Sequence, residues 1–353
     1  MLRKKGIETP SPALINQIAT SFGLEEARLK RGPDHDMGSS TFRLSTSRGE
    51  LALQRYRART LPNGAKAEAI KLRLDQQHAL LSYLSDRGFP VAEPLRTRAG
   101  GTTVDISGIT YALYPFVTGR PMDPGNPRHM KEAASALAFY HRLTAKYSGL
   151  TYAPQYSFPK LFQERLQGFY KDIEDLDSLT PASRIHRDLR LFRDVLPDIQ
   201  KEVATLPYDS LPKVVIHADF RRENLLFRHG KMSALIDFGR SRYEARALDL
   251  AIAVTELGPR TYDKTFLNLA HGFIFTYNSQ MPLDDAERRA LPILTQAWTA
   301  SRAFRKMRKL VHRKEHSKRV RKANQFSWCA GRLKWLRENR LAWRGIFSEG
   351  MDL

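Results

Sequence analysis

The chain has 353 residues, of which 42% are hydrophobic and 27% charged, a composition typical of a globular protein with a sizeable core. A single cysteine, Cys329, excludes an internal disulfide framework and a multi-cysteine zinc site, so we expect a reducing, cytoplasmic setting. The first twenty residues lack the apolar segment of a signal peptide, and no stretch reaches the roughly 18 apolar residues of a membrane-spanning helix. The formal net charge of +21 favours anionic over polycationic partners.

The first third of the chain predicts a sheet-rich unit that carries one long helix. Alternating apolar residues indicate strands, apolar residues at helical spacing indicate helices, and glycines mark their ends. These patterns predict a helix over 12–31, a hairpin over 37–56 with its turn at 47–49, a helix over 66–86 closed by Gly88, and strands over 91–95, 102–106 and 110–116.

After Gly119 the pattern becomes mainly helical. We expect helices over 127–147, 158–174 and 188–205, strands over 213–217, 224–227 and 234–237, and helices from about 248 to the end. The predicted fold class is therefore α+β and bilobal. Residues 1–116 would form a small antiparallel-sheet lobe, and residues 117–353 a larger, mainly helical lobe.

The segment from Val214 to Gly239 brings together residues suited to phosphoryl transfer. Asp219 and Asn224 lie five residues apart in a loop that follows an apolar strand, and Asp237 ends another apolar strand. A hairpin closed at 228–230 would place Asp237 beside Asn224. One carboxylate is then available to accept a hydroxyl proton, while an amide and a second carboxylate converge on a metal ion. These are the groups that phosphoryl transfer needs.

This segment resembles the aminoglycoside phosphotransferase family, whose relatives include choline kinases, type II homoserine kinases, and spore-coat and stress-response kinases. The family pattern H-G/A-D-x-x-x-x-N followed by I-D-x is matched by 217–224 and 236–238. The resemblance implies a protein-kinase-like fold, ATP or GTP as phosphate donor, Asp219 as catalytic base, and Asn224 and Asp237 as Mg²⁺ ligands.

Three neighbouring residues have expected roles as well. Arg222 would either neutralise the transferring phosphoryl group or remain a solvated arginine. His217 is expected to hydrogen-bond the backbone rather than to act as the base. The resemblance assigns Asp249, in the sequence Asp-Leu-Ala, a mainly structural role.

A second motif, His186-Arg187-Asp188-Leu189, spells the catalytic loop of protein kinases more literally. The position five after Asp188 is Arg193 rather than asparagine, and no apolar strand precedes the motif. Its surroundings predict a helix, so we interpret Asp188 as a residue of the first helical turn.

The resemblance also places a nucleotide site. It assigns the loop over the phosphates to Gly38, Ser39 and Ser40, and the base-contacting hinge to Tyr114, Phe116 and Val117. Family members carry a lysine or arginine on the third strand and a glutamate on the next helix, and the matching positions here are Gln54 and Gln77. The alternative cation, Arg55, would point to the opposite face of a regular strand. The replacement predicts weak or unusual nucleotide binding.

Residues 302–322 contain eleven Lys or Arg and one Glu. An apolar stripe predicts a docked helix whose basic face is either simply solvated or contacts an anionic surface. The stripe consists of Phe304, Met307, Leu310 and Val311, and a downstream set of Trp328, Trp335, Leu336 and Trp343 is expected in the core. Family members build one wall of the acceptor pocket from helices in this region, so the charge favours a neutral or anionic acceptor over an aminoglycoside.

Three functions remain open at this stage. The leading hypothesis is a small-molecule kinase that phosphorylates a sugar, an amino alcohol or a nucleoside-like natural product. The second is a protein Ser/Thr kinase of the stress-response type. The third is a degenerate kinase-fold module that binds an anionic partner, with salt-sensitive affinity.

Overall fold

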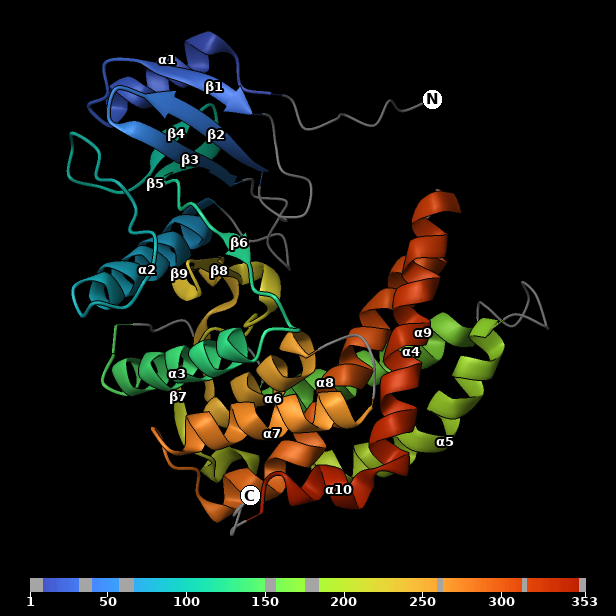
Figure 1. Cartoon of the computed structure of the whole chain (residues 1–353). Coiled ribbons are helices and arrows are strands. Elements are labelled where there is room, and N and C mark those ends of the chain that lie inside the picture. Colours follow the sequence, from blue (N-terminus) through green and yellow to red (C-terminus); the bar gives the residue numbers. More distant parts are fainter. Residues whose placement is uncertain are drawn as a thin grey trace.

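The computed structural model describes residues 9–31, 40–56, 67–149, 157–174, 184–258, 263–312 and 316–348. A five-stranded antiparallel sheet lies over a larger body of helices (Figure 1), which confirms the predicted α+β class. The strands are ordered β1-β2-β3-β5-β4 in the sheet. Their bounds are β1 (Ala27–Arg31), β2 (Ser40–Thr46), β3 (Gly49–Tyr56), β4 (Val104–Ile106) and β5 (Ile109–Pro115).

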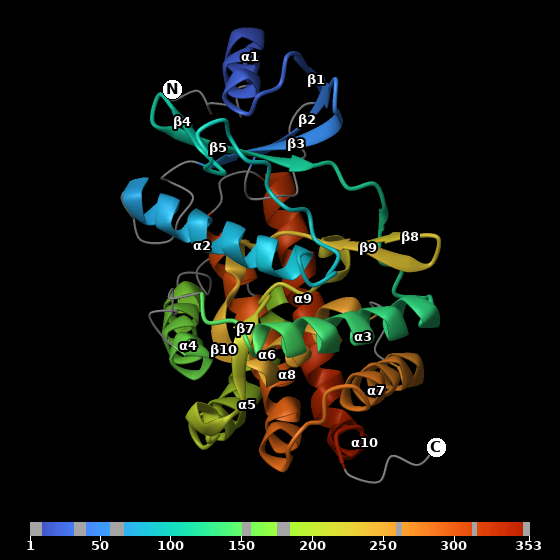
Figure 2. The ribbon, with the colours of Figure 1, turned by 90° about the vertical axis from the view of Figure 1, so that its left-hand side faces the viewer.

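Two helices cover the two faces of this sheet. On one face, α1 (Pro12–Ser21) buries Ile15 and Ile18 against strand residues such as Leu53. On the other face, α2 (Ala67–Ser85) lies between the sheet and the helical body (Figures 1 and 2). Because alternate strand residues point to opposite faces, Gln54 and Tyr56 of β3 share the face that looks toward α2.

The helical body encloses two small β units. The hairpin of β8 (Leu225–Arg228) and β9 (Lys231–Leu235) pairs with β6 (Arg120–Pro121), and β7 (Lys213–Ile216) pairs with β10 (Arg242–Ala245). The surrounding helices are α3 (Pro127–Thr144), α4 (Phe158–Glu174), α5 (Arg184–Ala204), α6 (Arg246–Leu257), α7 (Lys264–Asn278), α8 (Asp285–Val311), α9 (His316–Glu338) and α10 (Arg340–Gly345). None of the helices in the described ranges is both long and apolar enough to cross a membrane.

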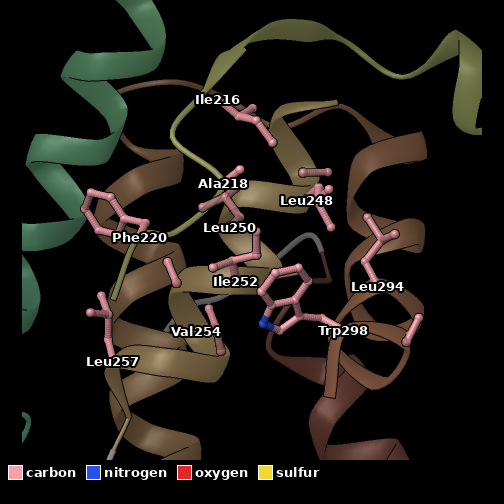
Figure 3. Close-up of a cluster of buried hydrophobic side chains, with 14 of the residues drawn as sticks. Ile216, Ala218, Phe220, Leu248, Leu250, Ile252, Val254, Leu257, Leu294 and Trp298 are labelled. Carbon is pink, nitrogen blue, oxygen red and sulfur yellow. The ribbon is translucent and has the colours of Figure 1, made fainter. Parts of the chain in front are cut away.

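Helix α6 forms the centre of the helical body. Its side chains are buried on all sides, and they pack against the end of β7 and the loop that follows it, as well as against Trp298 of α8 (Figure 3). A dense apolar core around α6 therefore packs against the chain between Ile216 and Phe220.

Two predicted elements differ from the structure. The helix expected over 12–31 ends at Ser21, because Gly23 adopts a φ of +70° and the amide of Leu24 closes the helix on Ala19 at 2.9 Å. Residues 27–31 form the edge strand β1 instead. The strand expected over 91–95 makes only an isolated bridge from Val91 to Leu235. Prolines at 90 and 94 remove two of the amide donors that a ladder requires.

The remaining elements agree with the sequence patterns. Gly88, with a φ of +74°, follows the end of α2 as predicted. In the basic segment, Phe304, Met307 and Leu310 are buried as expected of the apolar stripe. The downstream set at 328, 335, 336 and 343 is also buried in, or packed against, the core.

We predict that Gly119, between the sheet and the helical body, tolerates no side chain. A Cβ there would lie 2.8 Å from Ser233 Oγ and 3.0 Å from Leu226 Cβ. Gly119→Ala should lower the free energy of unfolding by about 1–3 kcal/mol through overpacking, measured by urea denaturation. Gly168→Ala is the matched control, because the space around Gly168 in α4 is open and alanine favours helix. Equal stability of the two variants would contradict the prediction.

Candidate active site

The loop after β7 is anchored by one buried carboxylate. Asp249 of α6 accepts hydrogen bonds from the backbone amides of His217 (2.7 Å) and Ala218 (2.8 Å). It also pairs with His141 Nε2 at 3.2 Å, and His141 Nδ1 lies 2.8 Å from the Tyr277 hydroxyl. Burial opposes ionisation, but the hydrogen bonds from His141 and from the His217 amide prevail and lower the pKa of Asp249. This arrangement supports the structural role predicted for Asp249.

The same loop carries Asp219 beside Asn224. The Asn224 amide nitrogen donates to the backbone oxygen of Asp219 (2.9 Å) and approaches its Oδ2 (3.3 Å). Because the nitrogen faces Asp219, Asn224 Oδ1 points away from Asp219. This oxygen is buried without a hydrogen-bond donor in the described part of the chain. A buried acceptor without a donor is costly, so it indicates that something else is normally bound there.

Asp237 lies next to Asn224, as the predicted hairpin requires. The turn between β8 and β9 has positive φ at His229 (+51°) and Gly230 (+75°), which suits a tight hairpin. The returning strand brings the amide of Ile236 to 3.0 Å from the backbone oxygen of Asn224. Asp237 follows in a left-handed conformation, with φ +65° and ψ +61°. Such strained backbone is concentrated at functional sites.

These residues fit a magnesium ion that binds together with a nucleotide. Asn224 Oδ1 and the Asp237 carboxylate supply two hard oxygen ligands, which Mg²⁺ prefers. Within the described ranges, no cluster of three His, Cys, Asp or Glu side chains could hold a metal alone. Phosphate oxygens and water usually complete the shell of Mg²⁺ in such sites.

Two hydrogen bonds to the backbone hold His217 in place. Its Nδ1 accepts a hydrogen bond from the amide of Asp219 at 3.3 Å, and its Nε2 lies 3.1 Å from the backbone oxygen of Ile236. Since a carbonyl only accepts, Nε2 must carry the proton. Both ring nitrogens therefore contact the backbone, as expected for His217.

Two arginines that the sequence did not single out lie at the Asp219 carboxylate. Arg221 Nε is 3.4 Å from Oδ2, and Arg240 Nη1 is 3.6 Å from Oδ1. The predicted Arg222 instead pairs with Glu223 at 3.2 Å. The sequence offered one signal for Arg240, which is its position three residues after Asp237. A site residue at the end of a strand brings the next few residues close to the site.

On the nucleotide side, the face of β3 toward α2 carries a chain of polar side chains. The Tyr56 hydroxyl donates to Gln54 Oε1 and lies 2.9 Å from the Tyr114 hydroxyl. The Tyr114 hydroxyl is 2.6 Å from His78 Nε2, and burial lowers the pKa of His78 to about 4. Tyr114, one of the predicted hinge residues, is thus held on its inner side by His78.

Arg73, rather than Gln77, joins helix α2 to the loop that follows Asp237. Arg73 donates to the backbone oxygen of Gly239, directly after the Asp237-Phe238 pair. Gln77 lies one turn further along α2, and no hydrogen bond joins it to Gln54 in the ranges that the structure describes. Arg55 lies on the opposite face of β3, where its guanidinium is 5.3 Å from the Phe42 ring centroid.

The other predicted nucleotide residues are placed unevenly. Gly38 and Ser39 lie outside the described residues, and Ser40 begins β2. Phe116 stacks against the Arg43 guanidinium at 4.0 Å, and its amide donates to the backbone oxygen of Glu50 at 3.0 Å. Val117 follows directly, half-buried.

The second motif lies in a helix, as predicted. Helix α5 begins at Arg184, so Asp188 lies one turn inside it and not in the first turn. Its carboxylate accepts a hydrogen bond from Ser327 Oγ of α9. Asp188 is therefore a contact between helices.

We predict that Asp249→Asn destabilises the fold as well as the loop. Asparagine has one acceptor oxygen for two backbone amides, and a buried donor left unpaired costs about 1–3 kcal/mol. Because the pKa of Asp249 is lowered on folding, its stabilising effect is present above the unfolded value of about 3.9 and is lost as pH falls below it. Urea denaturation should show a smaller difference in the free energy of unfolding between variant and wild type at pH 3 than at pH 7. The exposed control Asp209→Asn should change neither value, and an unchanged stability of Asp249→Asn would contradict the anchoring role.

Comparison with known proteins agrees with this geometry. Residues 31–303 match the family model described as the phosphotransferase enzyme family. The homoserine kinase of Caulobacter sp. (strain K31) is 30% identical over 279 residues, which make up 78% of this chain and 79% of that enzyme.

Two solved structures share the fold across most of the chain. The aminoglycoside phosphotransferase from Alicyclobacillus acidocaldarius aligns with a TM-score of 0.68 at 18% identity, over 95% of this chain and 98% of that one. Amicoumacin kinase hAmiN, solved in complex with AMP-PNP, Ca²⁺ and Ami, aligns with a TM-score of 0.62 at 14% identity, over 87% and 89% of the two chains. The chain therefore has the kinase-like fold and belongs to the phosphotransferase enzyme family, as an enzyme that transfers phosphoryl groups to hydroxyl acceptors.

Proposed function

We propose that the protein transfers the γ-phosphoryl group of ATP to a hydroxyl group of a small neutral or anionic acceptor. The observation that carries this proposal is the arrangement of the buried Asp219 and Asn224 with the half-buried Asp237. Asn224 faces Asp219 with its amide nitrogen and leaves its oxygen to a metal, so one side chain connects the base to the ion. GTP is the alternative donor.

Asp219 would accept the proton of the acceptor hydroxyl as its oxygen attacks the γ-phosphorus and ADP leaves. The hydrogen bond from Asn224 orients the Asp219 carboxylate for this transfer. Mg²⁺, held by Asn224 and Asp237, would neutralise charge on the phosphate oxygens. Arg221 and Arg240 lie closest to the base and are the first candidates to stabilise the transferring group, with Arg222 as a third.

The nucleotide would lie under the sheet, where the chain passes from one lobe to the other at 116/117. We propose that Gly38, Ser39 and Ser40 cover its phosphates and that Tyr114, Phe116 and Val117 flank its base. Gln54 would contact a phosphate through its amide nitrogen, since its oxygen already accepts from Tyr56. A neutral amide in place of a lysine favours weaker binding of the triphosphate.

The relative at 30% identity makes homoserine the first acceptor to test. A protein kinase of the stress-response type would phosphorylate itself or a generic protein substrate instead. A degenerate binding module would have no need of a buried oxygen without a donor at Asn224 or a strained Asp237, so the geometry favours the enzyme.

We predict that Asp219→Asn lowers the turnover number by about 10²–10⁴-fold while nucleotide binding is kept. The assay is Mg²⁺-dependent formation of ADP or GDP with homoserine, sugars, amino alcohols, nucleosides and aminoglycosides as acceptors. The matched control is Asp188→Asn, in the competing motif, which should retain most of the activity. Loss of activity in Asp188→Asn alone would overturn the assignment of the base.

We also predict that Gln54→Ala raises the KM for ATP by about 3- to 10-fold, the loss expected for one hydrogen bond to phosphate, with little change in the turnover number. Gln54→Lys should lower this KM, because it restores a charge opposite the phosphates. If both variants leave the KM for ATP unchanged, Gln54 does not contact the nucleotide.

A further inference from the structure

A cluster of cationic side chains lies on α4 and α8, and two of its members, Arg302 and Arg305, interact electrostatically with Asp219. Helix α8 packs against both α4 and α9, and the three lie together in Figure 1. Arg305 and Lys306 follow Arg302 by about one turn along α8. Arg165 of α4 joins them, with its Nη1 2.8 Å from the Ser301 hydroxyl. The half-buried inner part of the basic segment therefore faces into the protein rather than into solvent.

The nearby carboxylates account for only part of this charge. Glu256 forms an ion pair with Arg302, and Glu244 lies 3.5 Å from Arg242. In the part of the chain that the structure describes, no ion pair includes Arg165, Arg305 or Lys306. Arg305 instead lies over the Trp298 ring, 5.4 Å from its centroid. Arg165, Arg305 and Lys306 are thus half-buried without an ion-paired carboxylate, an arrangement that costs free energy. The carboxylates that act on them from a distance are Glu164, on Arg165, and Asp219, on Arg305.

The lowered pKa values of two members of the cluster agree with the shortage of ion pairs. Burial, followed by repulsion from Arg242 and Arg240, lowers the pKa of Arg165 to about 10. Burial, followed by repulsion from Arg302 and Lys322, lowers the pKa of Lys306 to about 7. An anion bound among these side chains would relieve both effects.

The cluster also lies within electrostatic reach of the base. Burial and neighbouring arginines lower the pKa of Arg305, and Asp219 is the carboxylate that opposes this. Asp219 likewise opposes the lowering of the pKa of Arg302, which burial causes first. The acceptor hydroxyl must reach Asp219, so an acceptor that extends from Asp219 toward α8 would approach Arg302 and Arg305.

We infer that the acceptor carries a phosphate group in addition to the hydroxyl that is phosphorylated, and that Arg165, Arg305 and Lys306 bind this group. This inference rests on the proposed function and narrows its substrate class. A phosphate dianion with three acceptor oxygens can engage two or three cations at once, whereas a single carboxylate matches one fork-shaped guanidinium. A polycationic acceptor would be repelled.

Binding of inorganic phosphate tests the cluster without relying on turnover. The protein is first saturated with AMP-PNP and Mg²⁺ to fill the nucleotide site, and phosphate is then titrated by calorimetry at constant ionic strength. We expect one phosphate per chain. Arg305→Gln should weaken this binding about tenfold or more, the effect of losing one charge-assisted hydrogen bond. The matched control is Arg308→Gln, an exposed arginine one turn further along α8, which should bind as wild type does. Absence of phosphate binding, or equal weakening in both variants, would overturn the inference.

Paired acceptors provide the second test. Glycerol is compared with glycerol 3-phosphate, and glucose with glucose 6-phosphate, with homoserine as the zwitterionic reference. We expect kcat/KM for the phosphate-bearing member to exceed that of its partner by about 30-fold or more, and Arg305→Gln to remove most of this preference. A preference for the neutral members or for homoserine that Arg305→Gln leaves unchanged would refute the inference and leave the proposed function standing. If no acceptor is phosphorylated, the proposed function fails, and the phosphate titration alone decides whether the cluster is an anion site.

Discussion

The active site depends on the buried carboxylate of Asp249. Two consecutive backbone amides, those of His217 and Ala218, donate to this side chain at the point where β7 ends. Ala218 has a φ of +60°, a conformation that costs of order 1–3 kcal/mol for a residue other than glycine and persists only when the surroundings impose it. The hydrogen bonds from the two amides to Asp249 stabilise this conformation. The position of Asp219, the next residue, follows directly.

A second strained residue completes the arrangement. Asp237 also has a positive φ, and it lies beside Asn224 because the hairpin of β8 and β9 pairs Leu225 with Leu235. The two carboxylates thus come from two strand ends that are fixed independently, one by α6 and the other by the hairpin. Asn224 lies between them. The nitrogen of its side-chain amide faces Asp219, and the oxygen faces the proposed metal. In the proposed reaction, this division would let one metal ion bind the phosphates while Asp219 remains available to the acceptor.

Local patterns in the sequence predicted much of the fold and the centre of the site. The spacing of Asp219, Asn224 and Asp237 could be interpreted because all three lie on one strand–loop–hairpin unit of about 25 residues. The helix over 12–31 was predicted too long because helical spacing continues past Gly23, where backbone conformation and not hydrophobicity ends the helix. The interaction of Arg305 with Asp219 joins segments far apart in sequence, and no local pattern indicates it. The basic run at 302–322 illustrates the same limit. Which of its cations face inward is decided by how α8 packs on α4 and α9.

Binding of Mn²⁺ in the presence of ADP, followed by electron paramagnetic resonance, separates the proposed metal ligands from the proposed base. If Asn224 and Asp237 hold the metal and Asp219 accepts the proton, Asp237→Asn should weaken Mn²⁺ binding about tenfold or more. Asp219→Asn should leave Mn²⁺ binding within about twofold of wild type. Equal weakening in both variants, or none in Asp237→Asn, would contradict the division between the base and the metal ligands.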